Sequence, residues 1–160
     1  MIELQLVGVR VELPTNQPIV LLKEREGERY LPIWIGPVEA TAIALGMQGV
    51  ETPRPLTHDL MRDLLQSLGI TVERIVITEL RDGTFFAEIH MSQNGTSISV
   101  SSRPSDALAL AVRMQLSIFA NEEVLDEASI AVRDDQDEDA EKEVERFREF
   151  LEQVSPEDFK

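Results

Sequence analysis

Residues 84–101, TFFAEIHMSQNGTSISVS, contain the pattern that decides the fold. The dipeptide Asn94-Gly95 is typical of a two-residue hairpin turn, because both residue types accept a positive φ. Such a turn pairs Met91 with Ile98, Ile89 with Val100, His90 with Ser99 and Glu88 with Ser101. One face of the predicted hairpin is therefore apolar and the other polar, as a half-buried antiparallel sheet requires.

The segments upstream of this hairpin extend the predicted sheet. Asp82-Gly83 is a second two-residue turn signal, so residues 70–80, 84–93 and 96–101 are expected to form a meander. In residues 2–13 the alternation of apolar positions changes phase beside Gly8, which is typical of a strand with a bulge. Further short strands are expected at residues 19–22, 30–35, 118–119 and 130–132.

Three segments have the spacing and end signals of helices. Pro37 suits the first position of a helix over residues 37–48. Thr57 is expected to be the N-cap of a helix that ends near Leu68 before Gly69. Its predicted apolar face consists of Leu60, Leu64, Leu65 and Leu68. A third helix follows the segment SSRPSD and ends near Met114, and Asn121 is expected to cap a helical turn to Leu125.

The C-terminal residues differ in composition from the rest. Residues 133–141 are a dense acidic block and are expected to form a solvated linker. In residues 142–160, Val144, Phe147, Leu151 and Val154 recur at helical spacing, which predicts an amphipathic helix that docks on another subunit or protein. We therefore expect an α+β domain over residues 1–132, with a bulged antiparallel or mixed sheet packed with about three helices, followed by linker and tail.

Composition and charge exclude several classes of protein. With 42% hydrophobic residues the 160-residue chain has enough apolar material for one globular core. No apolar stretch is long enough for a membrane span, and the chain contains no cysteine, so we expect a cytoplasmic protein without a membrane partner. The net charge is −15, of which residues 133–160 carry −7 (5 basic, 12 acidic). Strong passive binding to nucleic acid is therefore not expected, whereas a transient contact through local arginines is.

Two similar segments contain the residues with the most chemistry. PRPLTHDL (53–60) and SRPSDALA (102–109) both place Arg-Pro before a hydroxyl residue, an aspartate and a helical run. Arginines at helix N-termini suit phosphate, carboxylates suit Mg²⁺ or Mn²⁺, and a histidine suits acid/base catalysis. The same residues also suit a plain helix start, in which hydroxyls and carboxylates cap the helix and arginines form salt bridges.

Four segments together resemble the bifunctional nuclease domain family: LPIWIGPVEATAIA, PRPLTHDLMRDLLQSLG, LRDGTFFAEI and SRPSDALALAVR, in this order. The resemblance covers about residues 1–132. It implies an α+β domain that forms homo-oligomers and a nuclease, a hydrolase that cleaves DNA and RNA with the assistance of a metal ion. No organic cofactor is expected, since no Rossmann, Walker or HExxH pattern occurs.

The family's polar motif residues fall on nine positions: Glu39, Arg54, Thr57, His58, Asp59, Asp82, Arg103, Ser105 and Asp106. His58, Asp59, Arg54, Arg103 and Asp106 are then the candidate catalytic residues, and Arg54, Arg103, Ser105 and Thr57 the candidate substrate-binding residues. Glu39, Asp59 and Asp106 are the candidate ligands of Mg²⁺ or Mn²⁺, or they orient the arginines. Asp82 is also explained by its hairpin turn.

One residue departs from the family pattern. Ser101 stands where family members commonly have an aspartate, two residues before the second Arg-Pro arginine. Glu88, opposite Ser101 in the predicted hairpin, is the candidate substitute. Two hypotheses therefore stay open: a metal-assisted nuclease of low sequence preference, and a non-catalytic oligomeric module that binds an anion or a protein partner, with residues 142–160 as a docking segment.

Overall fold

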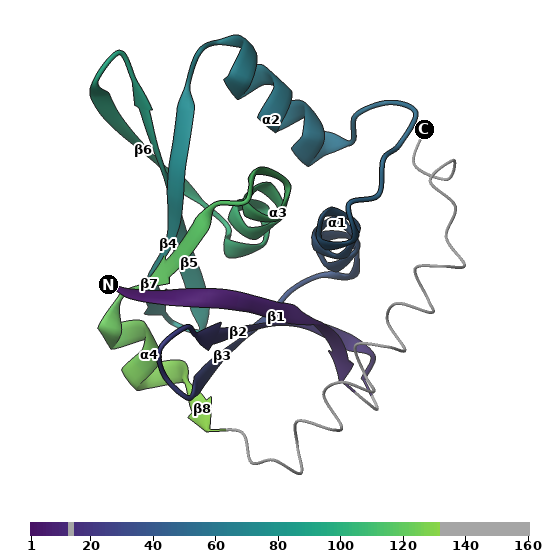
Figure 1. Cartoon of the computed structure of the whole chain (residues 1–160). Coiled ribbons are helices and arrows are strands. Elements are labelled where there is room, and N and C mark those ends of the chain that lie inside the picture. The colour runs from purple at the N-terminus through teal and green to yellow at the C-terminus, as the bar shows by residue number, and fades with distance from the viewer. Residues whose placement is uncertain (13–14, 132–160) are drawn as a thin grey trace.

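The structure is a computed structural model that describes residues 1–12 and 15–131 and contains one open, mixed β-sheet (Figure 1). The strands are β1 (Ile2–Glu12), β2 (Gln17–Glu24), β3 (Arg29–Trp34), β4 (Thr71–Arg81), β5 (Thr84–Gln93), β6 (Thr96–Ser102), β7 (Ser117–Ala120) and β8 (Ile130–Ala131). The helices are α1 (Pro37–Gln48), α2 (Thr57–Ser67), α3 (Pro104–Met114) and α4 (Glu122–Ala128). The predicted α+β class is confirmed, with four helices in the described residues where about three were expected.

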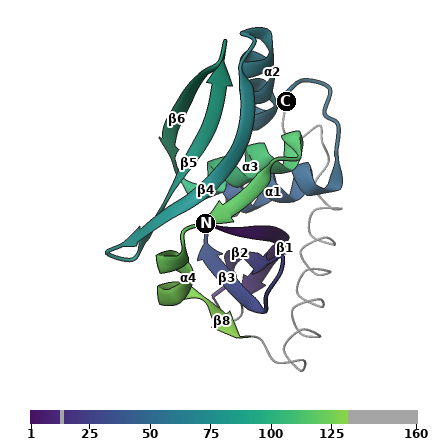
Figure 2. The same ribbon diagram turned by 60° about the vertical axis from the view of Figure 1, so that its left-hand side comes forward.

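The strand order in the sheet is β6-β5-β4-β7-β1-β2-β3-β8. Only β4 and β7 pair in parallel, and every other neighbouring pair is antiparallel. Strand β7 thus joins the meander β4–β6 to the N-terminal strands β1–β3, and Figure 2 shows the two halves twisted relative to each other. The two halves share one hydrophobic core cluster, to which α1, α3 and α4 contribute.

Both predicted hairpins are confirmed. Asn94 and Gly95 have φ values of 51° and 79°, and Asp82 and Gly83 have values of 52° and 78°, as a turn with two left-handed residues requires. The register between β5 and β6 is the predicted one, with Met91 opposite Ile98 and Ser99 opposite His90. The predicted bulge in β1 is also present, since the register with β2 shifts between Leu6 and Gly8.

Helix α3 lies between α1 and α2 and is the most buried of the four helices (Figure 1). Its residues from Ala107 to Ala111 are each at most 2% exposed, and they pack on the sheet beside Ile75, Ile77 and Ile89. Helix α4 lies apart from the other three and contacts β4 and β3 (Figures 1 and 2). The N-terminal ends of α1, α2 and α3 are thereby held on one scaffold.

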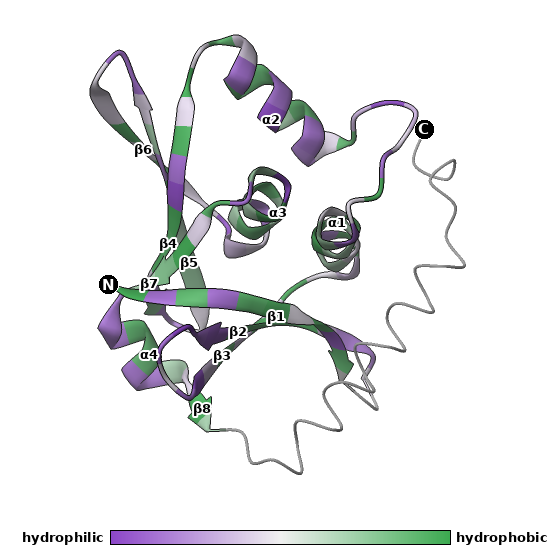
Figure 3. Ribbon diagram, in the orientation of Figure 1, coloured by the Kyte–Doolittle hydropathy of each residue, from purple (hydrophilic) through white to green (hydrophobic). Residues whose placement is uncertain are grey.

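The predicted apolar face of α2 is wrong in part. Leu65 packs against the core together with Met61, but Leu60, Leu64 and Leu68 are 48%, 53% and 63% exposed. Helix α2 lies on the core with the side that carries His58, Met61 and Leu65, at spacings of three and four residues. The three exposed leucines lie on a flank of that side, and Figure 3 shows hydrophobic bands on α2 as well as on the strands.

The predicted linker (133–141) and tail helix (142–160) lie outside the described residues. In the part of the chain that is described, none of the helices combines the length and the apolar character needed to cross a membrane.

Candidate functional site

The candidate site lies where the first turns of three helices meet. Glu39, Asp59 and Asp106 are each the third residue of their helices, α1, α2 and α3, and His58 is the second residue of α2. Acidic side chains are favoured in a first turn, because the helix dipole and the free N–H groups attract negative charge. Local sequence chemistry therefore explains these residue types, and tertiary packing decides what each one contacts.

His58 and Asp106 form the closest contact between α2 and α3. His58 Nε2 lies 3.0 Å from Asp106 Oδ1, and the His58 residue is only 8% exposed. With Asp106 ionised, Nε2 carries the proton and donates it to the carboxylate, which leaves the lone pair on Nδ1. No hydrogen bond to Nδ1 is found within residues 1–12 and 15–131. A carboxylate thus orients a histidine whose other ring nitrogen is able to accept a proton.

Arg103 links this pair to α1. It is the N-cap residue of α3, and its guanidinium donates to both carboxylate oxygens of Asp106, with Nε–Oδ2 at 2.9 Å and Nη2–Oδ1 at 3.2 Å. Its Nη1 donates to Glu39 Oε1 at 3.1 Å. The Arg103 side chain remains 63% exposed, so the cluster of His58, Asp106, Arg103 and Glu39 opens to solvent on the arginine side.

The charges in this cluster perturb two of its members. Burial acts to raise the pKa of Asp106, but the hydrogen bonds from Arg103 and His58 outweigh it, so the pKa lies below its ordinary value. The hydrogen bonds to Asp106, followed by the contact with Glu39, raise the pKa of Arg103. With His58 neutral, one arginine faces two carboxylates, and the cluster carries a formal charge of −1.

Asp59 belongs to a different ion pair, with an arginine that the sequence patterns did not single out. Arg113 Nε donates to Asp59 Oδ1 at 2.8 Å, and Arg113 Nη1 donates to the carbonyl oxygens of Ala42 and Ala109 at 3.0 and 2.8 Å. The Arg113 side chain is 5% exposed. Asp59 Oδ2 also accepts the backbone N–H of Leu56 at 3.0 Å. Asp59 therefore connects the start of α2 to α3 and, through Arg113, to α1.

The predicted N-cap of α2 is wrong by one residue. Leu56 is the N-cap of α2, and Thr57 is the first helical residue, exposed and without a capping hydrogen bond. The carboxylate of Asp59 reaches back to the N-cap N–H from inside the helix, as in half of a capping box. This bond satisfies the N–H of the N-cap residue itself, whereas Leu56 has no side-chain acceptor for the N–H groups of the first turn.

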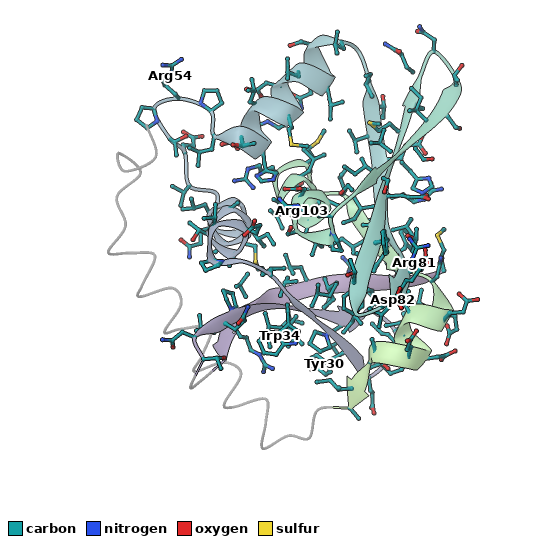
Figure 4. All side chains as sticks on the ribbon, turned by 180° about the vertical axis from the view of Figure 1, so that it is seen from behind. Tyr30, Trp34, Arg54, Arg81, Asp82 and Arg103 are labelled. Carbon is teal, nitrogen blue, oxygen red and sulfur yellow. The ribbon has the colours of Figure 1, made fainter. Side chains whose placement is uncertain are left out.

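The remaining candidate residues do not all join the cluster. Figure 4 shows Arg54 on the loop between α1 and α2, projecting away from Arg103. Ser105 is the second residue of α3 and only 7% exposed. Asp82 lies in its hairpin turn at the far end of β4. The two Arg-Pro segments therefore bring His58 and Asp106 together, while their arginines point to different places.

The position of Ser101 leaves no carboxylate next to Arg103 on β6. Glu88 lies opposite Ser101 in the sheet, as predicted. Its carboxylate pairs with His90, with Glu88 Oε2 3.1 Å from His90 Nε2. Glu88 and His90 form a second histidine–carboxylate pair of similar geometry, on a more exposed surface.

The three candidate metal ligands do not share one centre in this arrangement. Asp106 and Glu39 face Arg103, whereas Asp59 faces Arg113. Among residues 1–12 and 15–131, no three His, Asp or Glu side chains gather so as to hold a metal ion. A divalent cation at Asp106 and Glu39 would have to displace the guanidinium of Arg103, so these residues, as arranged, do not fit a metal ion.

Comparison with known proteins identifies the family of this chain. Residues 20–133 match the bifunctional nuclease domain. An uncharacterized protein of Mycobacterium tuberculosis is 52% identical over 163 residues, covering 99% of this chain and 98% of the relative. Bifunctional nuclease 2 of Arabidopsis thaliana is 29% identical over 115 residues, and bifunctional nuclease 1 of Oryza sativa subsp. japonica is 24% identical over 112 residues. Each of these plant alignments covers 68% of this chain, but only 35% and 34% of the plant proteins. The chain belongs to the bifunctional nuclease domain family.

Proposed function

We propose that the protein hydrolyses phosphodiester bonds of DNA or RNA with low sequence preference, at the cluster of His58, Asp106, Arg103 and Glu39. The observation that carries the proposal is the 3.0 Å contact between His58 Nε2 and Asp106 Oδ1 beside an exposed arginine. In such a site the carboxylate orients the histidine, the histidine accepts a proton as the base, and the arginine contacts a phosphate. The family match and the names of the plant relatives support the same reaction class.

In the proposed reaction His58 acts as the general base. Asp106 holds the proton on Nε2, so the Nδ1 lone pair takes a proton from a water molecule as the water oxygen attacks phosphorus. The bond between phosphorus and the leaving oxygen breaks, and that oxygen receives a proton from solvent. General base catalysis of this kind contributes a factor of about 10²–10⁴ in rate.

Arg103 is the proposed phosphate contact. Its bond to Glu39 is exposed, and exposed ion pairs contribute only about 0–1 kcal/mol, so a phosphate oxygen is able to compete with Glu39 for Nη1. The paired bonds to Asp106 hold the guanidinium plane in place during the exchange. The start of α3 adds its free N–H groups to the same side. Arg54, exposed on its loop, is then a contact to a more distant part of the nucleic acid.

Metal assistance by Mg²⁺ or Mn²⁺ remains a prediction of the family resemblance. Because the described side chains do not form a ligand set around one point, the reaction is proposed with His58, Asp106 and Arg103 alone. Hydrolysis measured in EDTA, in Mg²⁺ and in Mn²⁺ distinguishes a metal-assisted reaction from one that needs no metal ion.

The experiment that tests the proposal uses a matched pair of histidine variants. Highly purified wild type, His58→Ala and His90→Ala are incubated with single-stranded DNA and RNA, and product formation is followed over time. We expect His58→Ala to lose about 10²–10⁴ in rate, and His90→Ala to retain the wild-type rate. His90 is the matched control because its Nε2 also lies beside a carboxylate, at 3.1 Å. Equal activity in all three proteins would indicate a contaminating nuclease and would contradict the assignment.

A second candidate function is a non-catalytic oligomeric module that binds an anion or a protein. It is favoured by the pairing of Arg103, whose Nε, Nη1 and Nη2 all donate to carboxylates, and by the exposed row of Leu60, Leu64 and Leu68. In this case His58→Ala changes the stability of the protein without a loss of any activity.

The tail belongs to this second candidate, as a docking segment over residues 142–160. Deleting residues 133–160 is then expected to change the oligomeric mass or the recovery of a protein partner, because the apolar residues at helical spacing are removed. Sedimentation of full-length and shortened chains, together with affinity recovery, checks this. No change in either measurement would count against a docking tail.

A further inference from the structure

Among the described strands, β6 leaves an unpaired edge on the sheet. It is the outermost strand at one end and seven residues long, and no described strand pairs with its outer side. The opposite edge strand, β8, has only two residues. An unpaired edge presents a row of free N–H and C=O groups to any extended chain, and proteins commonly protect such edges with charged residues or proline. The sequence of β6, TSISVSS, contains neither.

The register of the hairpin shows which backbone groups point outward. The turn at Asn94-Gly95 joins Gln93 and Thr96 as a hydrogen-bonded pair. Hydrogen-bonded and non-hydrogen-bonded pairs alternate along an antiparallel ladder, so Ile98 and Val100 bond to β5. The N–H and C=O groups of Ser97, Ser99 and Ser101 therefore face away from the sheet.

The side chains of β6 are symmetric about Ser99. Residues 97–101 read SISVS, with Ile98 and Val100 on one face and serines on the other. If two copies of this strand pair antiparallel about Ser99, Ser97 meets Ser101 of the second copy and Ile98 meets Val100 of the second copy. The outward N–H and C=O groups of the three serines then bond to one another. Val100, which is 46% exposed, is covered by an apolar neighbour.

From this we infer that β6 is the contact through which two copies of this chain form a symmetric dimer with one continuous sheet. The contact suits a strongly acidic protein, because the strand has no charged side chain that would repel its own copy. A partner with the same neutral, alternating sequence satisfies each outward backbone group and each side-chain face together, which an arbitrary peptide does not.

The proposed dimer also has a consequence for the candidate site. Strand β6 ends at Ser102, directly before Arg103. In the symmetric register Ser102 lies opposite Thr96 of the second copy, so the Asn94-Gly95 turn of the second copy is placed beside Arg103. Each cluster would then have a wall contributed by the other chain.

The test uses opposite charges at the symmetry centre. The full-length protein is expected to have twice the 18.0 kDa mass of the chain in sedimentation equilibrium. Ser99→Lys and Ser99→Glu each place two like charges directly opposite one another in the dimer. Each variant alone is therefore expected to be a monomer. An equimolar mixture is expected to recover the dimer, because Lys and Glu then face each other. Ser92→Lys, on the same polar face of the neighbouring strand β5, is the matched control and should remain dimeric.

Two further measurements keep the result independent of folding defects in these variants. The amides of Ser97, Ser99 and Ser101 should be protected from hydrogen exchange in the wild type and unprotected in Ser99→Lys, while those of Ile98 and Val100 stay protected by β5. Because the chain has no cysteine, Ser99→Cys should form an intermolecular disulfide on mild oxidation, with Cα atoms about 5.5 Å apart in such a pair. Ser92→Cys should not form one.

Several outcomes would overturn the inference. A monomeric wild type excludes the dimer. A dimer that persists in both Ser99→Lys and Ser99→Glu has its contact elsewhere. If the mixture of these variants stays monomeric, β6 pairs with a different segment and not with its own copy.

Discussion

Asp59 and Asp106 occupy the same position in their helices and yet make different contacts. Both are third residues of a first turn, where an acidic side chain is favoured in any helix. Asp106 is turned toward Arg103 and His58, on the side that opens to solvent. Asp59 is turned toward Arg113, which is almost completely buried. Asp106 therefore belongs to the solvent-open cluster of the candidate site, whereas Asp59 forms a buried ion pair that holds α2 and α3 together.

Replacing Arg113 tests the supporting role of this ion pair. Arg113→Ala is expected to lower the free energy of unfolding by about 3–5 kcal/mol, because it removes the buried ionic partner of the Asp59 carboxylate. The Ala42 and Ala109 carbonyl oxygens lose a donor in the same variant. Urea unfolding measures the change.

Arg62→Ala is the control for this prediction. Arg62 also lies near Asp59, at 3.9 Å, but its side chain is 31% exposed and its closer contact is Asp63. We expect a change within about 0.5 kcal/mol, as for most surface substitutions. Equal losses in Arg62→Ala and Arg113→Ala would show that burial of the Arg113 pair is not what matters.

At the scale of elements, α1 and α3 approach closely at Gly46. A Cβ atom at this position would lie 2.5 Å from Val112 Cγ2 and 2.7 Å from Arg113 Nη1. Both distances are shorter than van der Waals contact allows, so the absence of a side chain is what permits the two helices to pack here. The same packing holds Glu39 within reach of Arg103.

Gly46→Ala is therefore expected to destabilise the protein, although alanine favours a helix by about 1 kcal/mol over glycine. Overpacking of this kind costs about 1–3 kcal/mol, so the net effect is a loss of stability. Met47→Ala, in the same turn and 41% exposed, serves for comparison and should have a smaller effect. Thermal and urea unfolding check the order of the two variants, and a stabilised Gly46→Ala would contradict the close approach.

Elements with strong local signals were predicted closely. The hairpins follow from Asp-Gly and Asn-Gly, and α1 follows from Pro37 at its first position; its bounds agree with the prediction. The N-cap of α2 was placed one residue late, and the exposed leucines of α2 were missed because their exposure depends on what lies opposite the helix. Thr57 is a good N-cap by type, but the helix begins one residue earlier than predicted, with Leu56 as the N-cap and its N–H bound by Asp59.

For the whole molecule, Arg29 connects the β2–β3 hairpin to α4. It donates to Glu24 at 2.8 Å, to Glu122 at 2.9 Å and to Asp126 at 3.1 Å. Glu24 is 8% exposed. The hydrogen bond from Arg29 lowers the pKa of Glu24 from its ordinary value of 4.5. A carboxylate whose pKa is lowered on folding stabilises the folded state above its unfolded pKa, and this contribution disappears as the pH falls through the lower folded value.

Stability is therefore expected to fall below about pH 4.5, and Glu24→Gln should flatten that part of the curve. The variant is less stable than the wild type at pH 7, since Arg29 loses its least exposed partner, and the two curves approach each other in acid. Urea unfolding between pH 3 and pH 7 measures both curves. Glu26→Gln, at an exposed position two residues away, should keep the wild-type slope. Parallel curves for wild type and Glu24→Gln would contradict the assignment.

The sequence by itself determined the strands, the two hairpins with their register, most of the helices and the family, because these depend on local turn chemistry, periodicity and motif order. Tertiary structure alone decided which candidate residues meet. His58 and Asp106 are 48 residues apart and Asp59 and Arg113 are 54 apart, so their contacts depend on how α2 and α3 pack on one sheet. Arg54 carries the same motif as Arg103 and lies apart from it, because Arg54 precedes the N-cap of α2 by two residues, whereas Arg103 is itself the N-cap residue of α3.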